Sequence, residues 1–311
     1  MVGGHATNVS VIGHLLGPED LVLHDSLAHD SIMGGAKLAG ARRRPFPHND
    51  FQAAERILRE IRSSVRRVLI AVEGVYSMDG DITPLPEFIA LRKKYGTLLF
   101  VDEAHSLGVL GASGRGVGEH YGVDRRDVDM WMGTMSKTLA SCGGYIAGSA
   151  ALIEYLKYTV PGFIYSVGMS PGNAAAALTA LRILVAEPER ARTCQERSAY
   201  FVRLCRDCGI DTGMSAQSAV VPCIVGNSYA SIRLAEGLLK RGIHVHPIIY
   251  PAVSETEARL RFFVTAAHSE EQLRYTADAL AEELTVLSLL PKKVQPEEVT
   301  GAEVPAPGGM S

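Results

Sequence analysis

The sequence has little of what marks secreted, membrane-spanning or nucleic-acid-binding proteins. Its five cysteines, at positions 142, 194, 205, 208 and 223, form an odd, scattered set that predicts reduced thiols rather than a disulfide framework. The net charge of −3 comes without a lysine- and arginine-rich run, so neither nucleic acid nor an anionic membrane is an expected partner. No apolar run is long enough to span a bilayer, and the start Met-Val-Gly-Gly-His lacks the basic region of a signal peptide. We therefore expect a cytoplasmic protein without a membrane span.

Two patterns suggest a metal, and neither is complete. Cys205 and Cys208 form a C-x-x-C, but a zinc or redox site needs a second ligand pair or a thioredoxin-like context. His24 and His29 belong to a His-Asp-x-x-x-His-Asp run for which no third ligand lies in register. We therefore predict no metal site, and we interpret the two thiols as neighbours on one helix.

What the chain does have is a regular alternation of apolar, strand-length runs and helical segments. Over the first 186 residues, strands are predicted at 21–23, 68–72, 98–101, 130–133 and 144–148. Helices are predicted at 31–38, 51–63, 84–95 and 171–186. Continuous apolar strands separated by helices predict an α/β fold whose mostly parallel sheet is covered on both faces.

The pattern changes after a break at Glu-Pro-Glu, residues 187–189. Predicted helices and strands there mix in a different order, with helices at 190–208, 231–241 and 270–289 and strands at 219–225, 243–249 and 258–265. We thus expect a large domain at residues 1–186 and a small α+β domain at residues 187–290. Residues 291–311 are rich in Pro, Gly and Glu and are predicted to form a disordered tail.

Chemistry-bearing residues follow two of the predicted strands. Asp102 comes directly after the strand at 98–101, and His105 follows three residues later. Lys137 lies in a loop of small and hydroxyl residues directly after the strand at 130–133. Because ligands bind at the carboxyl ends of strands in such sheets, and one strand–helix–strand unit separates Asp102 from Lys137, we expect the two to meet. Asp102 taken alone is equally well explained as a helix N-cap.

A lysine paired with an acid in this way is typical of a pyridoxal 5′-phosphate (PLP) site. The lysine forms an imine with the cofactor aldehyde, and a carboxylate opposite the pyridine nitrogen favours the protonated ring. Serine and threonine hydroxyls beside the lysine can hold the phosphate. The rival interpretation is a nucleotide-binding P-loop, but G-x-x-x-x-G-K-[ST] does not fit around Lys137. The sequence therefore predicts PLP as the cofactor.

Several segments together resemble one family of PLP enzymes. They are Glu-Gly-Val-Tyr-Ser-Met-Asp-Gly-Asp at 73–81, Val-Asp-Glu-Ala-His-Ser at 101–106, Gly-Thr-Met-Ser-Lys at 133–137, Phe-Pro-His-Asn-Asp at 46–50 and Ala-Arg-Leu-Arg at 258–261. These segments resemble the α-oxoamine synthases, and the likeness runs from residue 2 to about residue 288. The resemblance implies a fold-type I, aspartate aminotransferase-like large domain with a mostly parallel sheet, and a smaller C-terminal α+β domain. It also implies an acyltransferase that condenses an α-amino acid with an acyl thioester, usually with loss of carbon dioxide, to give an α-amino ketone.

The resemblance further implies a role for each site residue. Lys137 forms the Schiff base and removes the substrate α-proton, while Asp102 pairs with the pyridine nitrogen. His105 bonds the phenolic oxygen with Ser77 nearby, and His29 stacks on the ring. Gly4, His5 and Asn8, in a glycine-rich loop at residues 3–8, would hold the cofactor. Thr134 and Ser136 would bind its phosphate, and Arg261 would bind the substrate carboxylate.

Other polar residues near these motifs are interpreted as structural. Because Arg259 and Arg261 lie in one Arg-Leu-Arg strand, we expect one of the two to face outward. Asp79 and Asp81 are interpreted as turn-forming residues, and His48 as a structural histidine.

The family resemblance also predicts partners and leaves alternatives open. We expect a homodimer with the active site at its interface, and a donor carried by coenzyme A or by an acyl carrier protein. The family has a further segment before the loop at residues 3–8, so the resemblance implies an N-terminally truncated chain. Its relatives often carry a hydroxyl residue where Val167 stands, so we expect the phosphate contact across the dimer to be lost or shifted to Ser166. One alternative is another fold-type I activity, an aminotransferase or an aldolase. The other is a non-catalytic subunit of a synthase heterodimer, against which the presence of Lys137 argues.

Overall fold

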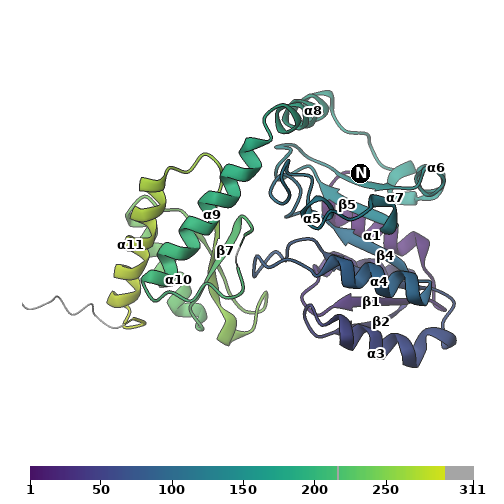
Figure 1. Ribbon diagram of the computed structural model, residues 1–311, viewed down its shortest axis with the longest axis horizontal. Coiled ribbons are helices and arrows are strands. Elements are labelled where there is room, and N and C mark those ends of the chain that lie inside the picture. Colours follow the sequence, from purple (N-terminus) through teal and green to yellow (C-terminus); the bar gives the residue numbers. More distant parts are fainter. Residues whose placement is uncertain (216, 291–311) are drawn as a thin grey trace, which may run out of the picture.

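The computed structural model describes residues 1–215 and 217–290. A six-stranded sheet forms the centre of the larger part (Figure 1), in the order β2-β1-β3-β4-β5-β6. Its strands are β1 (Leu21–Asp25), β2 (Arg42–Phe46), β3 (Val68–Glu73), β4 (Leu98–Asp102), β5 (Met130–Thr134) and β6 (Gly144–Gly148). All neighbouring pairs are parallel except β5 and β6. The predicted mostly parallel α/β fold is therefore confirmed.

Helices cover both faces of this sheet, because successive side chains of a strand point to opposite faces. Leu21 and Leu23 belong to one apolar core with α3 (Phe51–Ile61) and α4 (Leu85–Tyr95). Val22, between them, belongs to the other core, with α1 (Gly4–Leu15) and α2 (Asp30–Ala39). The remaining helices of this part are α5 (Val117–His120), α6 (Ala150–Thr159), α7 (Pro161–Ile164) and α8 (Pro171–Ala186), with short 3-10 turns at Arg62–Ser64 and Arg125–Asp127.

One expectation for this part was wrong, and one strand was not predicted. The segment predicted as a glycine-rich loop, residues 3–8, is the beginning of α1, which starts at Gly4 after an extended Gly3. Glycine disfavours a helix by only about 1 kcal/mol, and the packing of α1 against α2 outweighs that cost. The sequence also gave no sign of β2, because its three arginines are exposed on an edge strand that lacks an apolar pattern.

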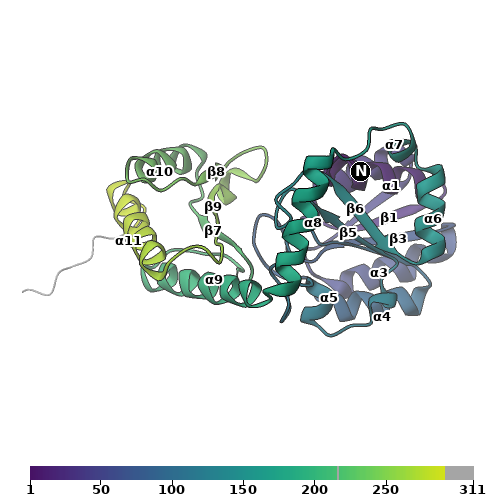
Figure 2. The same cartoon turned by 90° about the horizontal axis from the view of Figure 1, so that it is seen from above.

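The smaller part contains a three-stranded antiparallel sheet, in the order β7-β9-β8. Its strands are β7 (Val220–Ile224), β8 (His246–Ile248) and β9 (Arg259–Phe263), and its helices are α9 (Glu189–Asp207), α10 (Ser228–Lys240) and α11 (Glu270–Val286), with a 3-10 turn at Glu255–Glu257. Phe201, Leu234, Leu260 and Leu280 are fully buried between helices and sheet. In Figure 2 the two sheets lie in separate parts of the molecule, and α9 leads from α8 into the smaller one. The predicted tail at residues 291–311 lies outside the described residues. No helix among the described residues is long and apolar enough to cross a bilayer.

The two parts meet at a turn of the larger one, residues 76–81, which we call the docking turn. Ser218 donates a hydrogen bond to the Gly80 carbonyl at 2.6 Å, and Arg259 Nη1 donates to Asp79 Oδ1 at 2.5 Å. Arg261 Nη1 donates to the Ser77 carbonyl at 2.9 Å. The expectation that one arginine faces outward is therefore wrong, because residues two apart in a strand share a face. Asp79 likewise does more than form a turn, since it binds a guanidinium from β9.

Candidate active site

Four strands of the large sheet end in polar residues at the same edge. Asp25, Glu73, Asp102 and Thr134 are the last residues of β1, β3, β4 and β5, and parallel strands bring their carboxyl ends together. A cavity of about 380 Å³ lies at this edge, below Arg261 of β9. It is lined by every residue that the sequence predicts for the site, namely Gly4, His5, Asn8, His29, Ser77, Asp102, His105, Thr134, Ser136, Lys137 and Arg261.

Asp102 is buried and held by two hydrogen bonds. Asn8 Nδ2 of α1 donates to Asp102 Oδ2 at 2.8 Å, and the Ala104 backbone donates to Oδ1 at 2.9 Å. The same Asn8 nitrogen lies 2.9 Å from Ser31 Oγ, whereas Asn8 Oδ1 is buried and has no partner among the described residues. The carboxylate therefore has a fixed orientation at the floor of the cavity, with an unsatisfied acceptor beside it.

His29 caps the N-terminus of α2 and is oriented by its own hydrogen bonds. Its Nδ1 lies 2.7 Å from Ser31 Oγ, and its backbone N–H donates to Glu73 Oε1 at 2.6 Å. Burial lowers the pKa of His29, and burial together with the neighbouring Asp102 raises the pKa of Glu73 well above its usual value. The imidazole is therefore neutral near pH 7. The sequence did not indicate the Glu73–His29 bond, because the two residues are far apart in the chain.

Lys137 lies in a partly desolvated environment. Burial lowers the pKa of its ammonium to about 8, although Asp102 and Glu73 act in the opposite direction. Burial also lowers the pKa of His105 well below its usual value, with Lys137 adding to the effect. An amine with a lowered pKa is a better nucleophile and base near neutral pH than an ordinary lysine.

The opposite end of the cavity is lined by hydroxyls and by a helix N-terminus. Thr134 Oγ1 lies 2.9 Å from Ser136 Oγ, and a Cβ at Gly4 would lie 3.0 Å from Thr134 Cβ. The close approach of α1 thus requires a glycine at position 4. The first N–H groups of a helix lack intrahelical partners and favour an anion. This end of the cavity therefore suits a phosphate.

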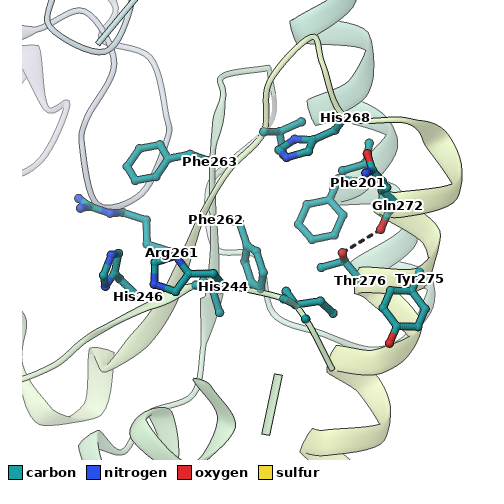
Figure 3. A pocket seen from close by; sticks show the side chains of 15 residues that line it. Phe201, His244, His246, Arg261, Phe262, Phe263, His268, Gln272, Tyr275 and Thr276 are labelled. Carbon is teal, nitrogen blue, oxygen red and sulfur yellow. Dashed lines mark hydrogen bonds between the residues drawn. The ribbon is translucent and has the colours of Figure 1, made fainter. Parts of the chain in front are cut away.

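Arg261 closes the cavity from the small sheet. Figure 3 shows Arg261 and Phe263 on one side of β9 and Phe262 on the other, and all three also help line another cavity of about 410 Å³. The Arg261 guanidinium lies 4.9 Å from the Phe263 ring centroid, and its Nε is buried without a partner among the described residues. Burial lowers its pKa, but an arginine remains charged. Its Nη1 already donates to the Ser77 carbonyl, so a partly desolvated guanidinium with an unpartnered Nε remains for a substrate carboxylate.

Comparisons with known proteins agree with this geometry. Residues 1–280 match the family described as aminotransferase class I and II. The chain is 41% identical to 8-amino-7-oxononanoate synthase of Symbiobacterium thermophilum over 279 residues, which cover 90% of this chain and 71% of that protein. It superposes on a serine palmitoyltransferase of Sphingomonas wittichii with a TM-score of 0.88 and 31% identity, covering 93% of this chain and 72% of the other. A structure of SPT with a PLP internal aldimine gives a TM-score of 0.86 with 27% identity, over 93% of this chain and 72% of that one.

The predicted resemblance is thereby confirmed, and with it the prediction of PLP as the cofactor. The chain belongs to the aminotransferase class I and II family and, within it, to the α-oxoamine synthases, the PLP-dependent acyltransferases that condense an amino acid with an acyl thioester.

Proposed function

We propose that this chain joins the α-carbon of an amino acid to the acyl group of a thioester, with Lys137, Asp102, His105 and His29 around the reacting atoms. The observation that carries the proposal is the convergence of a lysine of lowered pKa, a fixed carboxylate and an arginine with an unpartnered Nε on one cavity. The reaction needs each of these groups: the lysine removes the proton at the α-carbon, the carboxylate pairs with the cofactor nitrogen, and the arginine binds the substrate carboxylate.

The residues present fit PLP. The unsatisfied Asn8 Oδ1 and the fixed Asp102 carboxylate offer polar partners at one end of the cavity, and Thr134, Ser136 and the N-terminus of α1 suit a phosphate at the other. Asp102, His105 and Lys137 would hold the ring. Bound PLP supplies an electron sink for the pair of electrons released at the substrate α-carbon.

The remaining roles in the reaction belong to Arg261, Lys137 and His29. Arg261 binds the substrate carboxylate and orients the α-carbon toward Lys137. Because its pKa is about 8, the Lys137 amine is substantially neutral at mildly basic pH and can take the α-proton. The neutral imidazole of His29 positions the acyl donor, and Glu73 holds the backbone of His29 in place.

Thiol release tests this proposal. The chain with PLP, an acyl-CoA and glycine, L-alanine or L-serine should release free coenzyme A, and Lys137→Ala should not. Wild-type protein with PLP should also show an absorbance band at the edge of the visible range that Lys137→Ala lacks. Exchange of an amino acid with a keto acid, without thiol release, would instead identify an aminotransferase. Stable association with a full-length relative, without either reaction, would identify a non-catalytic subunit.

We also propose that the chain forms a homodimer through α6, α7 and the beginning of α8. This region exposes many large apolar side chains, among them Tyr158, Tyr165 and Val167 at 72%, 86% and 81% exposure. Contiguous apolar patches of this kind mark protein interfaces. Light scattering should give a dimer mass for wild type and a monomer mass for Tyr165→Glu with Val167→Glu. The domain division near residue 187, the cytoplasmic location and an acyl carrier protein as donor stay predictions.

A further inference from the structure

A larger cavity, of about 750 Å³, lies against the candidate active site. It is bounded by α8 and α9, by residues 104–109, by the start of β7 and by the end of β9 with residues 264–267. Ala104, His105, Lys137 and Phe263 line both cavities. The larger space therefore shares with the smaller one a wall that includes Lys137. Its volume falls within the roughly 300–1,000 Å³ that is usual for small-molecule sites.

The walls of the larger cavity are mainly apolar. Ile183, Leu184, Val220 and Val264 contribute aliphatic surface, and the small residues of the lining are five alanines, Gly108 and two threonines. Apart from His105 and Lys137 at the shared wall, the one ionisable group with a full charge in this lining is Arg190, which forms an ion pair with Glu187 at 2.5 Å. Such a lining offers few hydrogen-bond partners, so a polar occupant would lose its hydration without compensation. The chemistry of the walls favours an aliphatic group.

The apolar residues of helix α8 that line the cavity differ from those on the rest of the helix surface. Ala180, Ile183 and Leu184 line the cavity. Leu178, Leu181 and Val185 do not line it and are exposed. The cavity stripe contains one small residue, Ala180, and one buried large residue, Leu184, so single substitutions can shorten or lengthen the space from the same helix.

We infer that this cavity binds the aliphatic chain of the acyl thioester, and that Ala180 and Leu184 set the chain length that is accepted. This inference rests on the proposed function. The thioester carbonyl must reach the α-carbon between Lys137 and Arg261, so the rest of the acyl group needs apolar space that adjoins Lys137. The larger cavity provides that space. A buried methylene contributes about 0.8 kcal/mol, which corresponds to about a fourfold preference for each methylene that fits.

Chain-length profiles of two opposite variants test the inference. Thiol release is measured with straight-chain thioesters from butanoyl- to hexadecanoyl-CoA, using whichever of glycine, L-alanine and L-serine gives the fastest release. Ala180→Phe should move the preferred donor to shorter chains and lower kcat/KM for the wild-type optimum by tenfold or more. Leu184→Ala should move the preferred donor to longer chains. Ala186→Phe is the matched control, because residue 186 is exposed on the same helix and does not line the cavity.

A binding measurement separates failure of this inference from failure of the proposed function. Calorimetry with the PLP-loaded chain, without an amino acid, should show dodecanoyl-CoA binding at least tenfold tighter than coenzyme A alone, and Ala180→Phe should abolish the difference. If wild type releases no thiol from any donor, the proposed function fails, and the binding difference then decides alone whether the cavity takes an acyl chain. If thiol is released with the same length optimum in wild type, Ala180→Phe and Leu184→Ala, or if the control shifts equally, the inference is overturned.

Discussion

The ion pair between Asp79 and Arg259 offers the sharpest test of how the two parts of the molecule are joined. Arg259 is 3% exposed and Asp79 is 9% exposed, and they come from β9 and from the docking turn. Removing one partner of a buried pair leaves an uncompensated charge, which costs about 3–5 kcal/mol. Arg259 also donates to the Glu257 and Met78 carbonyls, so Asp79→Ala should cost about 3 kcal/mol, near the lower end of that range.

Partial and combined replacements refine this expectation. Asp79→Asn keeps an acceptor for Arg259 but loses the charge, and should cost about 1–2 kcal/mol. The pair Asp79→Leu with Arg259→Met replaces both charges by apolar groups, and should be more stable than the sum of its single variants predicts, by up to about 3 kcal/mol.

Urea unfolding provides the measurement. Far-ultraviolet circular dichroism follows both parts, while fluorescence of Trp131, the single tryptophan, reports on β5 in the larger one. Glu196→Ala is the control, because it removes an exposed ion pair with Arg192 on the surface of α9 and should cause no measurable change. A loss below about 0.5 kcal/mol for Asp79→Ala would refute the reasoning, since that value is typical of a substitution at a solvated surface.

Three further predictions concern the site and the docking turn. The rate at which PLP adds to Lys137, followed by the appearance of its absorbance band, should rise with pH around a midpoint near 8, where the amine loses its proton; a rate independent of pH between 6 and 9 would contradict this. Burial tends to lower the pKa of His48, but its hydrogen bonds to two aspartates outweigh burial and raise the pKa to about 10. Because the pKa is higher in the folded state, the charged imidazole should add fully to the free energy of unfolding, relative to His48→Gln, below about pH 6.5, and this contribution should disappear as the pH rises through 10. Urea unfolding measures the difference, and a difference that does not change with pH would exclude a charged imidazole. Gly80→Ala should lower the melting temperature strongly, because Gly80 has a φ of +73° and an added Cβ would collide with the Val220 carbonyl of β7. An unchanged melting temperature would show that the turn does not dock on β7.

Much of the large sheet could be predicted from its sequence, because strands buried on both faces are continuous apolar runs. The predicted strands at 68–72 and 98–101 each end one residue before the observed ones, and the extra residues are the polar Glu73 and Asp102. Apolar patterning detects the body of such a strand and not its polar last residue. The strand β2 escaped prediction for the opposite reason, since an exposed edge strand made of arginines carries no apolar signal.

Some residues of the candidate site and of the docking turn could likewise be predicted from the sequence, and others could not. Lys137 and Asp102 could be predicted, because each follows a recognisable strand and their chemistry is complementary. The role of Arg259 could not, because its partner Asp79 is 180 residues away and no local pattern links a strand arginine to a distant turn. The helical start of α1 was also hidden, since two glycines in sequence suggest a loop and only the packing on α2 makes a helix stable there.

The docking turn has a consequence for protein engineering. Its Asp81 binds His48 and Asn49, which follow β2 and also bind Asp25 at the end of β1. The turn binds the smaller part through Ser218 and Arg259. A chimera that receives its small domain from another family member therefore needs a serine and an arginine in that domain that are compatible with the recipient's own turn. Libraries recombined at the boundary near residue 187 should recover active members mainly where that short set of contacts is inherited from one parent.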